Sequence, residues 1–153
     1  MPRLIAIAIL FSTTLLLSGW QQTPAKPNFT GVWQLDPAKS KTEVKDDLSW
    51  KIDQTPAEIS IEELSGGKSL SNTKCVIGKV CEFSENGKKM TAMTYYLDTT
   101  LVQIRSAADN SSVIKRQLKM NDDGSLQVEL ITIVPSDKTE TIVFNKQTTA
   151  STH

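Results

Sequence analysis

The sequence predicts an all-β protein, an antiparallel up-and-down meander of about eight to ten strands that closes into a barrel. Segments with apolar residues at every second position recur along the chain, turn-forming residues separate them, and helical spacing is nearly absent. The first segment carries a Gly-x-Trp motif, Gly31-Val32-Trp33, soon after an apolar leader. Such segments also allow a two-layer sandwich, but short sequential hairpins favour the barrel.

The leader, residues 1–19, has the composition of a cleavable Sec-type signal peptide. Arg3 supplies a positive charge, residues 4–17 are mainly apolar, and Ser18-Gly19 offers small residues for cleavage. The apolar run is shorter than the ~20 residues that a membrane-spanning helix needs. Cleavage is therefore expected rather than anchoring.

Trp20 decides between a soluble and a lipid-anchored product. Residues 17–19 resemble the start of a lipoprotein cleavage box, but Trp20 lacks the thiol that such a box requires at the next position. We therefore expect a secreted or periplasmic protein with no stable membrane anchor after signal cleavage. Residues 20–27 form a flexible mature N-terminus in this interpretation, because they are polar and interrupted by prolines.

The charge balance of the mature chain argues against a nucleic-acid partner. Cleavage removes Arg3 and no acidic residue, leaving sixteen basic against seventeen acidic side chains. Nucleic acids and anionic membranes need a concentrated positive field, which this balance does not supply. A mature length of about 130 residues suits one domain. We place that domain at residues 28–147, followed by a disordered tail at 148–153.

The strands follow from alternation and from the turns between them. Proline ends the first strand at Asp36-Pro37, since it cannot donate to a strand ladder, and Asn, Asp and Gly mark the later reversals. A single helical turn is expected around residues 37–43, with Asp36 as its cap. The expected strands are 29–36, 48–53, a segment around Ile59 and Ile61, 75–83 folded about Gly78, 88–97, 101–106, 112–120, 126–134 and 138–146.

The chain resembles a known family at both ends. Residues 29–40, Phe-Thr-Gly-Val-Trp-Gln-Leu-Asp-Pro-Ala-Lys-Ser, resemble the opening of a family of small exported bacterial lipocalin-like proteins, and residues 133–144 resemble its closing hairpin. With the two cysteines and residues 113–116, the likeness spans about 28–146. It implies a lipocalin-like barrel, at most small apolar ligands, and no enzymatic activity. The Thr-Asp-Tyr triplet of better-studied lipocalins is missing.

The resemblance also implies a role for Trp33. In lipocalins the tryptophan of the Gly-x-Trp motif closes one end of the barrel, and a basic side chain near the last strand crosses it. Such a cation–π contact is worth about 0.5–2 kcal/mol. Lys146 lies in the right stretch, with Arg116 as the alternative, and Gly31 would allow close backbone approach. Trp33 as simply a large core residue is the plainer interpretation.

Cys75 and Cys81 are the chain's two cysteines, and export favours a disulfide between them. A three-residue loop at 77–79 would place them opposite each other, whereas a two-residue turn would misalign them. The spacing is too long for a Cys-x-x-Cys redox pair, and zinc needs two more ligands. A structural bridge worth about 2 kcal/mol is therefore expected.

The sequence offers little for catalysis. His153 is the single histidine and the last residue, so no triad can be built on a positioned imidazole. The adjacent acids Asp46-Asp47, Glu62-Glu63 and Asp122-Asp123 could suggest a two-carboxylate hydrolase. Neighbours on a strand point to opposite faces, however, so solvated faces and turns explain them better. We predict no enzyme, no metal and no cofactor.

Binding of a small hydrophobic ligand inside the barrel is the function that remains. A cavity of ~300 Å³ or more would be needed, and the alternative is a filled barrel that serves as an envelope structural or protein-interaction module. Arg105 and Arg116 could pair with a ligand carboxylate if they point inward, although solvent-facing arginines are more usual. The candidate lining residues are Trp50, Ile52, Ile59, Ile61, Met93, Tyr95, Val102, Ile104, Arg116, Val128, Leu130, Ile142 and Phe144.

Overall fold

The computed structural model describes residues 25–44 and 47–148, and these fold into ten strands. The predicted signal peptide, part of the predicted N-terminus and tail, Asp46 and His153 lie outside the described residues. The strands are β1 (Gly31–Leu35), β2 (Leu48–Gln54), β3 (Glu58–Ser65), β4 (Lys68–Val76), β5 (Val80–Glu85), β6 (Lys88–Leu97), β7 (Thr100–Ala107), β8 (Val113–Met120), β9 (Leu126–Val134) and β10 (Lys138–Lys146).

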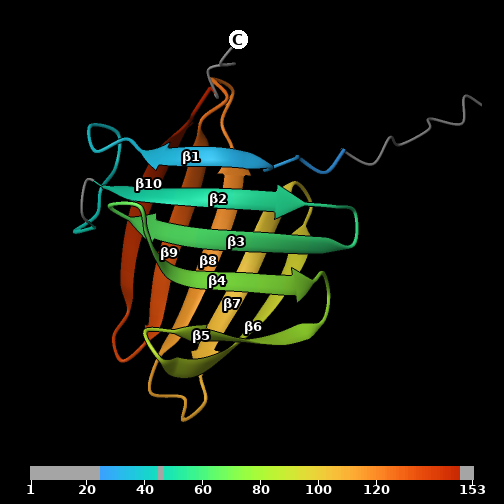
Figure 1. Cartoon of the computed structure of the whole chain (residues 1–153), viewed down its shortest axis with the longest axis vertical. Coiled ribbons are helices and arrows are strands. Elements are labelled where there is room, and N and C mark those ends of the chain that lie inside the picture. The colour runs from blue at the N-terminus through green and yellow to red at the C-terminus, as the bar shows by residue number, and fades with distance from the viewer. Residues whose placement is uncertain (1–24, 45–46, 149–153) are drawn as a thin grey trace, which may run out of the picture.

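The ten strands form one closed antiparallel barrel in which each strand pairs with the next along the chain. β1 closes the barrel, because Trp33 lies opposite Trp50 on β2 and opposite Lys146 on β10. In Figure 1, strands β1–β5 form the front wall and β6–β10 cross behind them. The predicted all-β up-and-down barrel is therefore confirmed, and the sandwich alternative is wrong.

The barrel has two different ends, because the turns of a meander alternate between them. One end carries the turns after β2, β4, β6 and β8 and is crossed by residues 25–30, and we call it the strap end. The other carries the turns after β1, β3, β5, β7 and β9, and we call it the loop end. This division matters for function because the two halves of the interior differ in chemistry.

The helical turn expected at residues 37–43 does not form. The chain makes a turn at 37–39 and then pairs with β10, where Lys41 forms a β-bridge with Thr141. The Ser40 hydroxyl accepts from the backbone N–H of Val143 at 2.9 Å and donates to the carbonyl of Asp36 at 2.7 Å. Backbone groups that a helix would have satisfied internally are thus satisfied by the neighbouring strand.

An apolar core fills much of the interior. Trp33 and Trp50 are both fully buried, and the rings of Trp50 and Phe144 lie with centroids 5.0 Å apart. The cluster consists of Phe29, Trp33, Leu35, Leu48, Trp50, Ile52, Ile59, Ile61, Leu101, Leu118, Leu126, Val128, Ile142 and Phe144.

The β4–β5 hairpin contains the predicted disulfide between Cys75 and Cys81, whose Cα atoms lie 5.4 Å apart. The register that pairs Ser71 with Glu85 also places the two cysteines opposite each other, as a three-residue loop requires. The described ladder between β4 and β5 is limited to that one residue pair. The disulfide therefore holds the strap end of the most weakly paired seam in the barrel.

Candidate functional site

Polar side chains are buried inside the barrel, in the same alternation phase as the apolar core. Glu63 follows Ile59 and Ile61 on β3, and Arg116 precedes Leu118 on β8. Strand geometry therefore directs these polar groups inward along with their apolar neighbours. Apart from Ser125 in the β8–β9 turn, the buried polar residues are Glu63, Ser71, Thr73, Thr94, Gln103, Arg105 and Arg116.

Glu63 is the centre of this set. Its Oε1 accepts hydrogen bonds from Nη1 of Arg116 at 2.7 Å, from Nη1 of Arg105 at 3.1 Å and from the Ser71 hydroxyl at 2.8 Å. Its Oε2 accepts from Nη2 of Arg116 at 3.0 Å, which makes that pair bidentate. Arg105 Nη2 also donates to Glu85 Oε1 at 2.8 Å. We call Glu63, Glu85, Arg105 and Arg116 the buried ion network.

The formal charges of the network cancel. Burial raises the pKa of Glu63, but the charges of Arg116 and Arg105 and the hydrogen bonds from Arg116 and Ser71 together outweigh it, so the pKa of Glu63 lies below its ordinary value. Burial, together with the charge of Arg116, lowers the pKa of Arg105, and Glu63 and Glu85 oppose this shift. Guanidinium groups stay protonated in proteins. Two cations thus face two anions, and the interior is electrically balanced.

Aromatic rings flank both arginines. The guanidinium carbon of Arg116 lies 5.0 Å from the ring centroid of Trp50, and that of Arg105 lies 4.6 Å from the ring centroid of Phe83. Cation–π contacts of this kind stabilise a desolvated cation by about 2 kcal/mol or more. The rings and the carboxylates together hold the guanidinium planes in defined orientations.

Several atoms around the network are buried without a hydrogen-bond partner. Among the described residues these atoms include Nε of Arg105, Nε of Arg116 and Nε1 of Trp50, all obligate donors. Gln103 donates to the hydroxyl of Thr94 at 3.2 Å, but its Oε1 has no partner, and neither has the hydroxyl of Thr73. The region thus retains unused hydrogen-bonding capacity.

A hollow of about 250 Å³ lies at the loop end beside the network. Glu85 belongs to both, since its carboxylate contacts Arg105 and its side chain lines the hollow. The hollow is therefore linked to the buried arginines through Glu85. It is lined by Glu85, Asn86, Lys88, Met90, Ala107, Ser111 and Ser112.

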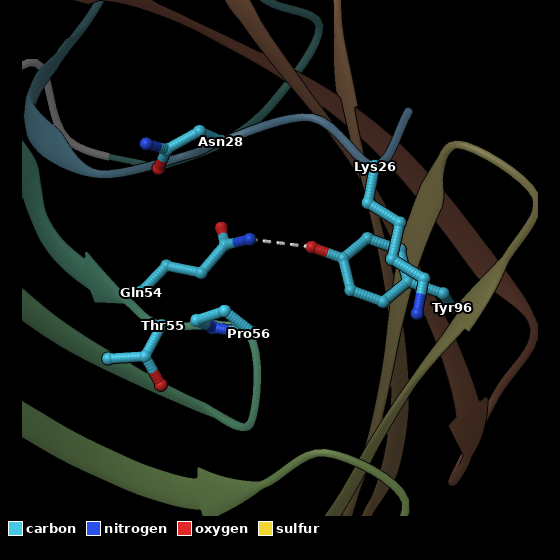
Figure 2. A pocket seen from close by; sticks show the side chains of 6 residues that line it. All are labelled: Lys26, Asn28, Gln54, Thr55, Pro56 and Tyr96. Carbon is cyan, nitrogen blue, oxygen red and sulfur yellow. Dashed lines mark hydrogen bonds between the residues drawn. The ribbon is translucent and has the colours of Figure 1, made fainter. Parts of the chain in front are cut away.

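A second hollow, of about 330 Å³, lies at the strap end between the N-terminal segment and the β2–β3 turn (Figure 2). Its polar atoms are engaged in holding that segment. Gln54 Nε2 donates to the Tyr96 hydroxyl at 2.8 Å and to the Pro27 carbonyl at 3.2 Å, while its Oε1 accepts from the N–H of Phe29 at 3.0 Å. Burial raises the pKa of Tyr96, although the hydrogen bond from Gln54 opposes this. Lys26 Nζ lies 4.8 Å from the Tyr96 ring centroid.

Trp33 is fully buried towards the strap end and contacts the predicted lysine, and its role as a plug stays a prediction. Lys146 Nζ lies 5.4 Å from the Trp33 ring centroid, and the indole N–H donates to the Phe29 carbonyl at 2.8 Å. Gly31 adjoins the same lysine, and a Cβ atom at this position would lie 2.6 Å from Lys146 Cε. Arg116, the alternative partner, contacts Trp50 instead.

Most of the candidate lining residues lie on the inner face of the barrel. Whether they contact a ligand stays a prediction. Those on the inner face are Trp50, Ile52, Ile59, Ile61, Arg116, Val128, Leu130, Ile142 and Phe144.

Four candidates were placed on the wrong face: Met93, Tyr95, Val102 and Ile104. Met93 is 40% exposed, and the buried phase of β6 contains Met90, Ala92 and Thr94. Register pairs Met93 with Ile104 and Tyr95 with Val102, so all four share the outer face, although Val102 is buried there. Both faces of β6 and β7 carry apolar residues, and pairing with β8 directs the phase of Leu101 and Met90 inward.

Two residues of the buried ion network were expected to face solvent. Arg105 was expected to face solvent and is 1% exposed, and Glu63 was expected on a solvated face and is 8% exposed. Glu63 carried a usable signal, because it continues the alternation of Ile59 and Ile61. Arg105 carried none, since the apolar phase of its strand contains Val102 and Ile104.

The acidic pair Asp122-Asp123 is a surface turn feature, and Asp46 of the remaining pair lies outside the described residues. Asp123 accepts hydrogen bonds from the N–H and hydroxyl of Ser125 in the β8–β9 turn, at 2.9 and 2.6 Å. Within residues 25–44 and 47–148, no group of His, Cys, Asp and Glu is arranged to hold a metal ion. The same part of the chain contains no helix of the length and apolarity required to cross a bilayer.

Comparison with known proteins finds similarity in structure but not in sequence. No protein-family model matches the chain, and neither does any curated protein. A secretary abundant heat soluble (SAHS) protein from Ramazzottius varieornatus matches with a TM-score of 0.62 and 12% identity, over 82% of this chain and 98% of that one. Lipid binding protein 8 from Caenorhabditis elegans matches with a TM-score of 0.60 and 9% identity, over 78% and 95%.

These likenesses define a class of fold. The chain forms a closed up-and-down barrel, and the two matched structures share its fold. Identities this low show the fold alone, so function must be argued from the side chains inside the barrel.

Proposed function

We propose that this protein is exported and binds a small hydrophobic molecule inside the barrel, which the molecule enters from the loop end. The buried ion network carries the proposal. Burying two guanidinium groups adds little to stability, because well-packed apolar residues in place of buried ion pairs are often equally or more stabilising. Ligand sites, by contrast, are typically apolar enclosures with a few oriented polar groups.

The surroundings of the network support a binding role. The hollow at the loop end is lined by Glu85, whose carboxylate contacts Arg105, and by Met90, whose side-chain type repacks readily. The name of one structural neighbour describes a lipid binding protein. A site that enlarges as Met90 moves would admit an apolar molecule towards the arginines.

The proposal includes export and kinship with the small exported bacterial lipocalin-like proteins. The disulfide between Cys75 and Cys81 supports an oxidising compartment, where such bonds persist. The composition of residues 1–19 supports a cleaved leader. The intact mass of protein recovered from its native compartment should match a chain that begins shortly after Gly19, whereas an uncleaved chain would contradict export by this route.

Blocking the hollow tests the binding site. Ala107→Phe places a ring in the loop-end hollow and should weaken binding of a fluorescent apolar probe by roughly tenfold or more. Ser106→Phe is the matched control, because its side chain points outward from the same strand and should leave binding unchanged. Native mass spectrometry of the protein from its host would report any resident small molecule. Failure of apolar probes to bind the unmodified protein would refute the proposal.

The outer surface favours a second candidate, a filled barrel that acts as an interaction module of the envelope. Val80 is 66% exposed and pairs in register with Met93, which is 40% exposed, and Val76 is exposed nearby. Exposed apolar neighbours of this kind occur at protein interfaces. Sedimentation at increasing concentration should reveal self-association that Val80→Lys abolishes, and a monomer at all concentrations would argue against self-association through this surface.

A further inference from the structure

We infer that the ligand is uncharged and carries a hydrogen-bond-accepting oxygen, and that Glu63 is the residue that excludes carboxylates. This inference rests on the proposed function, because it names the ligand class for the same interior site. It follows from the charge balance of the buried ion network and from the donors left unpartnered around it.

The charge balance opposes an acidic ligand. Two arginines face two glutamates, and the Arg105 and Arg116 side chains are at most 5% exposed. A carboxylate added to this interior would be an unpaired buried anion, which is strongly unfavourable. An uncharged molecule adds no such charge.

Glu63 already occupies the positions that a ligand carboxylate would take. Both terminal nitrogens of Arg116 donate to its two oxygens, at 2.7 and 3.0 Å, in the bidentate geometry that carboxylates adopt with arginine. Arg105 donates to Glu63 and to Glu85, so neither of its terminal nitrogens is left without an acidic partner. An incoming acid would have to displace a resident one.

The unpartnered donors call for an acceptor of another kind. Nε of Arg105, Nε of Arg116 and Nε1 of Trp50 are buried without partners. They lie around the same carboxylate, since both arginines donate to Glu63 Oε1 and Trp50 is the register partner of Glu63. A carbonyl, ester or hydroxyl oxygen accepts hydrogen bonds from such groups without adding charge.

The test compares two probes that share the same apolar chain and differ in the charge of the head group and by one methyl group. Purified full chain is titrated with dansylaminoundecanoic acid and with its methyl ester, at a pH where the acid is ionised. The unmodified protein should bind the ester roughly tenfold more tightly or better, because the acid brings an unpaired buried charge. Glu63→Gln removes the resident anion, leaves an uncompensated arginine and should reverse the preference.

Two further variants keep the test decisive. Glu62→Gln is the matched control, because its side chain lies on the opposite face of β3, and it should preserve the preference for the ester. Glu85→Gln alters a partly exposed member of the network and should shift the preference towards the acid by a smaller factor, even if Glu63→Gln does not fold.

The possible outcomes separate the two proposals. Tighter binding of the acid by unmodified protein, or an unchanged preference in both network variants, overturns the inference and leaves the proposed function standing. If neither the acid nor the ester binds unmodified protein, the proposed function is overturned and this inference with it.

Discussion

Near the strap end, the barrel interior is apolar, with Phe29 and Trp33 fully buried and Lys146 placed over the indole. Towards the loop end, the same enclosure contains two arginines and a glutamate, each less than 10% exposed. Apolar burial stabilises a fold by about 25 cal/mol per Å², whereas burial of ion pairs contributes little or nothing net. The comparison assigns stability to the first half and supports the proposal that the second half serves recognition.

The largest expected effect comes from removing the centre of the network. Glu63→Ala leaves Arg105 and Arg116 buried without their shared carboxylate, and loss of one partner of a buried pair costs about 3–5 kcal/mol. Urea denaturation measures this change in the free energy of unfolding. A change below about 1 kcal/mol would show that the carboxylate acts like an exposed surface charge.

A triple variant of the buried ion network separates its effect on stability from its effect on binding. Glu63→Leu combined with Arg105→Met and Arg116→Met should regain most of the stability lost in Glu63→Ala, because apolar replacements of buried ion networks are often neutral or stabilising. The triple variant should nevertheless lose its preference between charged and uncharged probes. If it stays as unstable as Glu63→Ala, the network is structural rather than functional.

The disulfide should contribute the next largest effect. Replacing Cys75 and Cys81 together by alanine should lower the free energy of unfolding by about 2 kcal/mol, because the bridge closes a short loop. Denaturation with and without reductant measures it. Reductant should destabilise unmodified protein by the same amount and leave the double variant unaffected, and an equal response in both would exclude the bridge as the cause.

A smaller effect is expected at the strap end. Lys146→Met keeps an apolar stem beside Trp33 but removes the charge, so it should lower stability by about 0.5–2 kcal/mol. Lys51→Met, on the outer face of β2, is the control and should change stability by less than about 0.5 kcal/mol. Equal effects of the two substitutions would contradict a specific contact with the indole.

The pH dependence should report the network directly. Since the pKa of Glu63 in the folded protein lies below its ordinary value, this group contributes stability that is fully present above about pH 4.5. That stability is lost as the pH falls towards the folded-state pKa. The melting temperature should therefore fall below this pH, and less steeply in Glu63→Gln. Equal slopes in both proteins would assign the acid sensitivity to other carboxylates.

Much of the fold could be predicted because the alternation of apolar and polar residues along single strands indicates it. Alternation was unambiguous on β2 and β3, where Trp50, Ile52, Ile59 and Ile61 are all buried. On β6 both alternation phases contain apolar residues, so the pattern could not choose between Met93 and Ala92. Pairing with neighbouring strands made that choice, and it is not a local property.

The sequence by itself determined the class of fold and the pairing of the cysteines, because each depends on nearby residues and on strand periodicity. The tertiary structure alone decided that Glu63, from β3, meets Arg105 and Arg116 from β7 and β8. Both arginines lie more than forty positions from Glu63 in the sequence. The alternation of β7 also did not single out Arg105 as an inward residue. Closing the barrel brings such residues together, and no local signal encodes that contact.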